Sequence, residues 1–448
     1  MNAIWALVAF IAVIVVWNVG LKRNIGESMF VGFVATALFA GTGFPAALWE
    51  GLLSGLQNDV TYAAIAFVVV GDILTRAGVI QRIVDMLSSL VGRFRGGSIH
   101  AATIGSGLFG AVAHNGSATA ATIGSITIPW MQRSGASGET SALVISGNAG
   151  VGAVFPFSGA FFLMLAAPTV VGVLTADDVI VAMFLAGIWM VLVRLAVGYV
   201  LVRRRGVGAM AEADVQPISR TFRVGWSSLI VLAAIAVPIL ATAGSTGAWV
   251  IAQVGEDAAD TIPLLVWLPV AMLVPGLIVG RKLLPTTAAG WWGMFGHTSP
   301  KLAIVAATMI SSFSASEVLS NLGLGEQLAP VVEQLHGVPG ILVAAVVGIV
   351  VIIIAGPLST TATLAAVGAV AFAAMTAAGV PPVWAFAAAI VFAASESASP
   401  PGAAPLYVAA AIANINPVRI FQPVILYYLI PTFLLGVLMA VGIAWIPQ

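Results

Sequence analysis

The sequence predicts an all-α, polytopic membrane protein built from two inverted repeats, with about ten spanning helices and two re-entrant hairpins. The first observation is composition: 60% of the 448 residues are hydrophobic and 8% are charged. A soluble domain carries about 25% charged residues, so lipid must solvate much of this chain. The 48 glycines and 23 prolines further indicate interrupted helices.

The same composition argues against several classes of protein. There is no cysteine, which excludes disulfides and thiolate metal sites, and the four histidines are scattered. We therefore expect no cofactor and no transition metal. Because 17 basic residues balance 17 acidic ones without a basic arm, nucleic acid is not an expected partner. The first apolar run precedes Lys22 and Arg23, which predicts a retained helix and not a signal peptide.

Ten apolar runs are long enough to cross a membrane, which takes about 20 residues. Two of these runs, 140–171 and 382–413, are too long for one simple span and carry a Gly/Pro/Ser interruption, which predicts broken helices. The ten runs are 2–21, 27–45, 60–76, 140–171, 179–202, 224–243, 262–280, 300–319, 382–413 and 420–446.

Two further stretches, 96–132 and 338–375, contain no Asp, Glu, Lys or Arg. Each is interrupted near its middle by small polar residues, at 115–119 and at 356–361. Two full crossings would need about 40 residues plus a turn, and each stretch is shorter than that. Both are therefore predicted to be re-entrant hairpins. The amphipathic stretches 79–95 and 324–336 that lead into them are predicted to be arms or ordinary membrane-surface helices.

Basic loops set the predicted orientation. Residues 203–205 and 281–282 are basic and are placed in the cytoplasm, while the acidic segment 256–260 between them is placed outside. The N-terminus then lies outside, with the first hairpin on the cytoplasmic side and the second on the outer side. The predicted organisation is repeat 1 at 1–205, a cytoplasmic loop at 206–223 and repeat 2 at 224–448.

Four features recur in the two halves at a shift of about 244 residues, which is typical of the inverted repeats of secondary transporters. Chance similarity among Gly/Ala-rich helices is the alternative. The predicted pairs are Asp72 with Glu317, Gly92 with Gly337, Ser117 with Thr360, and Pro156 with Pro400.

The segment 116–129, GSATAATIGSITIP, resembles the large, DctM-like membrane subunit of tripartite ATP-independent periplasmic (TRAP) transporters. The second hairpin tip, GPLSTTA at 356–362, is similar to that family and closer to the branch served by TAXI-type binding proteins. Many members have an Asp where Leu358 and Ser359 stand, and Phe155-Pro156-Phe157 holds one proline where a pair is common.

The resemblance implies an elevator-type carrier of the ion-transporter superfamily that imports an organic acid on a sodium gradient. It implies three partners: an extracytoplasmic substrate-binding protein, a small four-helix membrane subunit that is not fused here, and the lipid of a bacterial or archaeal inner membrane. A stand-alone sodium- or proton-coupled anion carrier without a binding protein is the alternative. A membrane enzyme or a channel is the third possibility, but no nucleophile or metal motif supports an enzyme.

Sodium prefers oxygen ligands, which broken helices and hydroxyls supply. The first tip with the first broken helix is predicted to hold one ion, and the second tip with the second broken helix a second. The alternative is that these hydroxyls bond to carbonyls of their own helices. The predicted ion ligands are Ser117, Thr119, Asn148, Gly150 and Gly152 for the first site, and Gly356, Ser359, Thr360, Thr361, Ser397 and Ser399 for the second.

The substrate is predicted to lie between the tips, at half-helix N-termini. Glu396 is also a candidate ion or proton ligand, because a charge within the membrane usually has a purpose. Arg194 could hold a carboxylate, although pairing or snorkelling is favoured. The predicted substrate-site residues are His114, Asn115, Ser158, Glu396 and Pro400.

Overall fold

The computed structural model describes residues 2–113, 115–210, 212–242, 249, 252–253, 264–324, 326–327, 330, 337–356 and 358–447. Every regular element in these ranges is a helix, as the composition predicted. The helices are α1 (Asn2–Val15), α2 (Ile25–Ala37), α3 (Phe44–Gln57), α4 (Asp59–Arg76), α5 (Val79–Val91), α6 (Gly97–Ala113), α7 (Gly116–Arg133), α8 (Gly138–Asn148), α9 (Gly159–Leu165), α10 (Ala176–Arg205), α11 (Ile218–Thr242), α14 (Leu264–Gly280), α15 (Ala288–Asn321), α17 (Gly340–Ala355), α18 (Thr360–Ala377), α19 (Pro382–Ala393), α20 (Ala404–Ile412), α21 (Phe421–Val424) and α22 (Ile430–Ala440).

Several of these helices are long and apolar enough to cross a membrane. Within the described ranges there are 5, or up to 7 if each of two bent helix pairs is one span. Other predicted spans correspond to shorter apolar helices, such as Asn2–Asn18 and Pro382–Ala398, and the second of these ends where serines and prolines divide the apolar run 382–413. The structure therefore shows a polytopic helical membrane protein.

Two segments differ from the helix boundaries expected from hydropathy. Helix α3 was not predicted, because Glu50 and small residues dilute its apolar pattern. Gly41, at φ +61°, separates α3 from α2, in a conformation that glycine adopts at little cost. Helix α15 begins at Ala288, twelve positions before the predicted run, since Trp291 and Trp292 extend it. Of the two predicted amphipathic arms, α5 is a helix, and 324–336 lies largely outside the described residues.

Both uncharged stretches form helical hairpins. In the first, α6 packs against α7, and in the second α17 packs against α18. Each hairpin turns near its central small polar residues, since α6 ends at Ala113 and α7 begins at Gly116, while α17 ends at Ala355 and α18 begins at Thr360. The side of the membrane that each hairpin faces stays a prediction.

Both predicted broken helices are present. In the first, α8 runs into a short 3₁₀ turn, Val151–Val154, and α9 starts again at Gly159, bent by 40°. In the second, α19 runs into the turn Ala394–Ala398, and α20 starts at Ala404. Phe157 in the first break has φ +68°, a strained conformation for a bulky residue.

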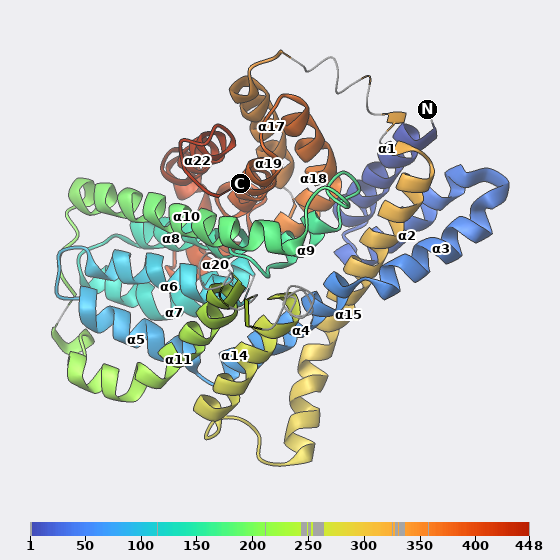
Figure 1. The fold of residues 1–448 in the computed structure, drawn as a ribbon. Helices are drawn as coiled ribbons and strands as arrows, with labels where there is room; N and C mark the ends of the chain where they lie inside the picture. The colour runs from blue at the N-terminus through green and yellow to red at the C-terminus, as the bar shows by residue number, and fades with distance from the viewer. Residues whose placement is uncertain are drawn as a thin grey trace.

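The helices pack into two groups (Figure 1). In one group α15 packs on α2, α3 and α4, while α14 lies against α4 and α11. In the other group α20 packs on α7 and α8, and α19 packs on α10, α18 and α22. Both hairpins and both broken helices therefore belong to the same group.

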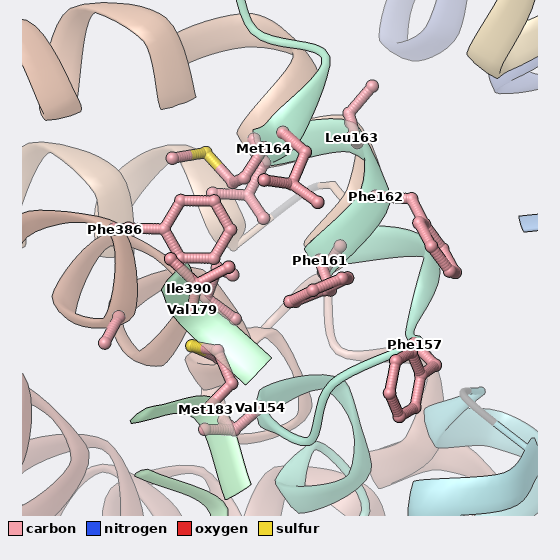
Figure 2. Close-up of a cluster of buried hydrophobic side chains, with 14 of the residues drawn as sticks. Val154, Phe157, Phe161, Phe162, Leu163, Met164, Val179, Met183, Phe386 and Ile390 are labelled. Carbon is pink, nitrogen blue, oxygen red and sulfur yellow. The ribbon is translucent and has the colours of Figure 1, made fainter. Parts of the chain in front are cut away.

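The largest apolar core lies around the second half of the first broken helix. Figure 2 shows Phe161 and Met164 of α9 facing Phe386 of α19 and Met183 of α10. All four side chains are buried. Phe157 extends this cluster, because its ring meets that of Phe161 edge to face at a centroid distance of 5.8 Å and stacks on Phe67 of α4 at 4.2 Å. That stack joins the break to the other helix group.

Candidate functional site

The two hairpin tips have the same capping geometry. At the first tip the Asn115 side chain accepts a hydrogen bond from the Ala118 N–H at 2.8 Å. At the second, the Ser359 hydroxyl accepts one from the Ala362 N–H at 3.2 Å. Both interactions satisfy a backbone donor in the first turn of a helix, α7 at the first tip and α18 at the second.

A second interaction repeats at both tips. The Thr119 hydroxyl donates to the Asn115 carbonyl, and the Thr363 hydroxyl donates to the Ser359 carbonyl, each at 2.9 Å. Both helices, α7 and α18, thus present a capped N-terminus, where the helix dipole favours negative charge. The cap uses the oxygen of Asn115, and among the described residues no acceptor pairs with its amide hydrogens, which could donate to an anionic group.

The two broken helices meet at Ser397. Its carbonyl accepts a hydrogen bond from the Ser146 hydroxyl at 2.8 Å, and its hydroxyl accepts one from the Gly150 N–H at 3.0 Å. A Cβ on Gly150 would collide with the Ala394 carbonyl oxygen, so only glycine fits there. Ser397 was predicted to serve the second ion site, and its two oxygen atoms instead contact the first broken helix.

A buried, unpaired oxygen lies at the first break. Asn148 is fully buried, and its amide nitrogen donates to the Thr103 hydroxyl of α6 at 2.9 Å. Among the described residues, its Oδ1 has no hydrogen-bond partner, and neither do the buried hydroxyls of Ser106 and Ser395. An unpaired buried oxygen costs free energy unless something binds it. Neutral oxygens of this kind fit a hard monovalent cation such as sodium.

Hairpin α6–α7 approaches the first break closely. Gly152 lies directly against the backbone of Gly110 in α6, with no room for a Cβ. Thr103 and Gly107 of the same helix face contact Asn148 and Val151. The predicted ligands Gly150 and Gly152 therefore let the backbones of neighbouring segments approach each other.

Glu396 lies between the two tips. One of its carboxylate oxygens accepts a hydrogen bond from the Thr360 N–H, at the start of α18. The other lies 3.3 Å from where a Cβ on Gly116 would be, at the start of α7. Glu396 was a candidate ion or proton ligand from its place in the sequence, and the structure places its carboxylate beside both capped helix N-termini.

The other predicted site residues fall into two sets. The hydroxyls of Thr119, Ser158 and Ser399 donate to carbonyls within their own segments, which is the structural role considered from sequence. The remaining residues lie at the tips or at the turns. At the tips, Ser117 and Thr361 are half-buried and Thr360 is buried. At the turns, Gly356 and Pro400 are half-buried. Thr361 also approaches Gly159 of the first broken helix. His114 lies outside the described residues.

Arg194 pairs with polar groups of the C-terminal segment, which is one of the two roles favoured from sequence. It is fully buried in α10 and does not snorkel. Its guanidinium donates to the Tyr428 carbonyl at 2.9 Å and to the Thr432 hydroxyl at 2.6 Å, and it lies 4.9 Å from the centre of the Tyr428 ring. The same ring packs on Gly147, one residue before Asn148. Arg194 thus holds Tyr428 in place, and the Tyr428 ring in turn packs against the first break.

Sequence reasoning missed four residues whose side chains lie at the breaks, namely Thr103, Ser106, Ser146 and Ser395. Thr103, Ser106 and Gly110 recur at helical spacing in an uncharged stretch, and this pattern could have marked one small, polar face of α6. In the part of the chain that the structure describes, no group of three His, Cys, Asp or Glu side chains could hold a metal ion.

A family model matches nearly the whole chain, residues 4–447; its description is "Tripartite ATP-independent periplasmic transporter, DctM component". Among solved structures, the Alcanivorax borkumensis YdaH transporter matches with a TM-score of 0.63 and 16% identity, over 91% of this chain and 90% of that one. At that identity the match establishes the shared fold.

Curated relatives align over parts of their length. A C4-dicarboxylate TRAP transporter large permease protein of Rhodobacter capsulatus is 30% identical over 39% of both chains. An ectoine TRAP transporter large permease protein of Halomonas elongata is 28% identical over 27% of this chain and 28% of its own. A sialic acid TRAP transporter permease protein of Haemophilus influenzae is 22% identical over 51% of this chain and 35% of its own. The chain thus spans well under two thirds of these relatives in each alignment.

Proposed function

Because this chain belongs to the DctM family of TRAP transporters, which are permeases and not enzymes, we propose that it imports an organic acid in symport with sodium. The family works with a small membrane subunit and a periplasmic binding protein. We assign this chain the same two partners and a place in a bacterial or archaeal inner membrane. The substrate would move with the group that holds the hairpins, in an elevator-type motion against the other group.

One observation carries the proposal: both hairpin tips and both broken helices meet around Asn148, Ser397 and Glu396. Discontinuous helices that meet within a membrane are typical of substrate and ion sites in secondary transporters. The buried Asn148 oxygen favours a cation at the first break. The capped N-termini of α7 and α18 favour an anion between the tips.

Glu396 bears on how that anion is bound. Its carboxylate already occupies the N-terminus of α18, where a substrate carboxylate would otherwise bind. A cation or a proton at Glu396 would remove the repulsion between the two negative charges. We therefore assign Glu396 to coupling. Two of the relatives are named for acids, C4-dicarboxylates and sialic acid, which supports an organic acid as the substrate class.

The test is uptake into liposomes that contain this chain and its small subunit, with the binding protein added outside. We expect Ser117→Ala and Thr360→Ala to raise the sodium concentration for half-maximal uptake about fivefold each, the equivalent of one weak ligand. Ser125→Ala is the matched control, because this exposed hydroxyl on α7 donates to the Thr122 carbonyl and bonds to no other described residue.

Unchanged sodium dependence in both tip variants would refute the ion-site assignment. Uptake that needs neither sodium nor the binding protein would favour the stand-alone, proton-coupled carrier instead. Each charge that moves inward gains about 2.3 kcal/mol per 100 mV, so that two sodium ions suffice to concentrate a mono-anion steeply.

A further inference from the structure

An apolar groove of about 290 Å³ lies on the surface between α10 and residues 426–431, and no residue of the tips or breaks lines it. Helix α10 lies beside α22 here (Figure 1). Apolar side chains of both segments line the groove, and Tyr427 contributes its ring. The lining residues are Val193, Ala196, Val197, Val200, Leu426, Tyr427 and Pro431.

The hollow has a local cause. Residues Ile425–Leu429 form a π-helical turn, which adds a residue to the helix and disturbs its regular packing. Tyr428 turns inward, onto Gly147 and Arg194, while Leu426 and Tyr427 remain at the rim. Pro431 follows in the first turn of α22. The groove therefore forms because the π-helical turn directs Tyr428 inward to Arg194 and leaves Leu426 and Tyr427 at the surface.

A positive charge closes one end of the groove. Val193, Val197 and Val200 recur at helical spacing on α10, and Arg204 is the next position of that stripe. The Arg204 guanidinium donates to the Tyr427 hydroxyl at 3.0 Å, which ties the cation to the opposite wall. In the described ranges no ion pair involves Arg203, Arg204 or Arg205. The sequence places these three arginines at the cytoplasmic surface.

We propose that this groove binds one anionic phospholipid, with an acyl chain along α10 and the phosphate at Arg204. An arginine fork matches phosphate oxygens, and a basic residue at the membrane surface attracts anionic lipids. A free phosphate ion would gain nothing from the apolar walls.

The test uses native mass spectrometry of the delipidated full chain, titrated with phosphatidylglycerol or phosphatidylcholine that carry identical acyl chains. We expect the wild type to prefer phosphatidylglycerol. Arg204→Gln is expected to lower that preference about fivefold, which corresponds to the loss of one surface charge. Arg203→Gln is the matched control, since this guanidinium lies 4.8 Å from the centre of the Tyr199 ring, away from the groove, and should leave the preference unchanged.

A second pair of variants tests the acyl-chain contact. Ala196→Phe fills the groove and should weaken the binding of both lipids, whereas Leu192→Phe, at an exposed position of α10 outside the groove, should not. Equal losses in Arg203→Gln and Arg204→Gln, or competition by inorganic phosphate alone, would overturn the proposal. Displacement of the lipid by the small membrane subunit would likewise overturn it and assign the groove to a protein partner. If Ala196→Phe does not fold, the comparison of Arg204→Gln with Arg203→Gln still tests whether the groove binds an anionic lipid.

Discussion

In the first broken helix Asn148 donates its amide to Thr103 of the neighbouring hairpin, whereas Phe392 stands at the matching position of the second, at the shift of about 244 residues. Phe392 is fully buried and packs on Gly348 of α17 and on Gly436 of α22. The first break is therefore joined to its hairpin by a hydrogen bond, and the second by an aromatic ring that packs against glycines.

The same contrast continues four residues later. Gly152 lies against the backbone of Gly110, while its counterpart Glu396 extends a carboxylate to the Thr360 N–H. The tips themselves are nearly identical, down to the N-cap and the back-bonded threonine. Repetition thus preserves the turn chemistry that shapes the backbone, while the side chains that face the centre differ.

Because Phe392 joins the second break to its hairpin by packing alone, we expect it to contribute mainly to stability. Phe392→Ala should have the largest effect on the free energy of unfolding. Removing a fully buried phenylalanine costs about 3–5 kcal/mol, because a cavity remains. We expect that loss in the free energy of unfolding of the purified protein, measured by denaturant titration. Phe94→Ala, at a side chain that is 68% exposed, should change the free energy by less than about 0.5 kcal/mol. Equal losses in the two variants would remove the structural role of Phe392.

Glu396 holds a charge where its counterpart Gly152 has no side chain, so we expect Glu396 to couple ion or proton binding to transport. Glu396→Gln keeps the shape of the side chain and an oxygen that can accept the Thr360 N–H, and it removes the negative charge that a coupling cation or proton would neutralise. We expect uptake at least about tenfold slower, with thermal stability nearly unchanged. Glu50→Gln, an exposed carboxylate on α3, is the control and should transport normally. Normal uptake by the Glu396 variant would exclude its coupling role.

The close approach at Gly152 can be tested by adding a single methyl group. Gly152→Ala forces the first break away from Gly110, and overpacking of this kind costs about 1–3 kcal/mol. Gly105→Ala lies in the same hairpin helix and meets no atom closer than 3.4 Å. That control should be neutral or gain up to about 1 kcal/mol from helix propensity. Thermal unfolding of both variants decides whether the approach is as tight as the structure indicates.

The smallest expected effect separates ion binding from folding at the first break. Asn148→Ala removes the unpaired buried oxygen, and we expect the half-maximal sodium concentration to rise about fivefold. Phe392→Leu should leave that concentration unchanged while lowering stability. Asn321→Ala, an exposed amide on α15, controls for a general amide effect. The reverse pattern, with sodium dependence moved by Phe392 and not by Asn148, would contradict the comparison.

Much of the fold could be predicted because the membrane imposes strong local rules. A backbone without water must form helices, so apolar runs and their Gly/Pro interruptions locate helices and breaks. This is why the hairpins, both broken helices and the tips were predicted close to their positions in the structure. Helix α3 was missed because Glu50 interrupts a run that packing against α15 completes.

The sequence by itself determined the membrane class, the hairpins and the breaks, and it predicted a role for Glu396, since each depends on local composition or on the cost of charge in lipid. Only the tertiary structure decided which side chains contact one another across distant segments. It paired Ser397 with the first break, buried Arg194 on a carbonyl, and left the Asn148 oxygen without a partner among the described residues. These contacts join segments far apart in the chain, where side-chain direction and packing, and not local pattern, select the partner.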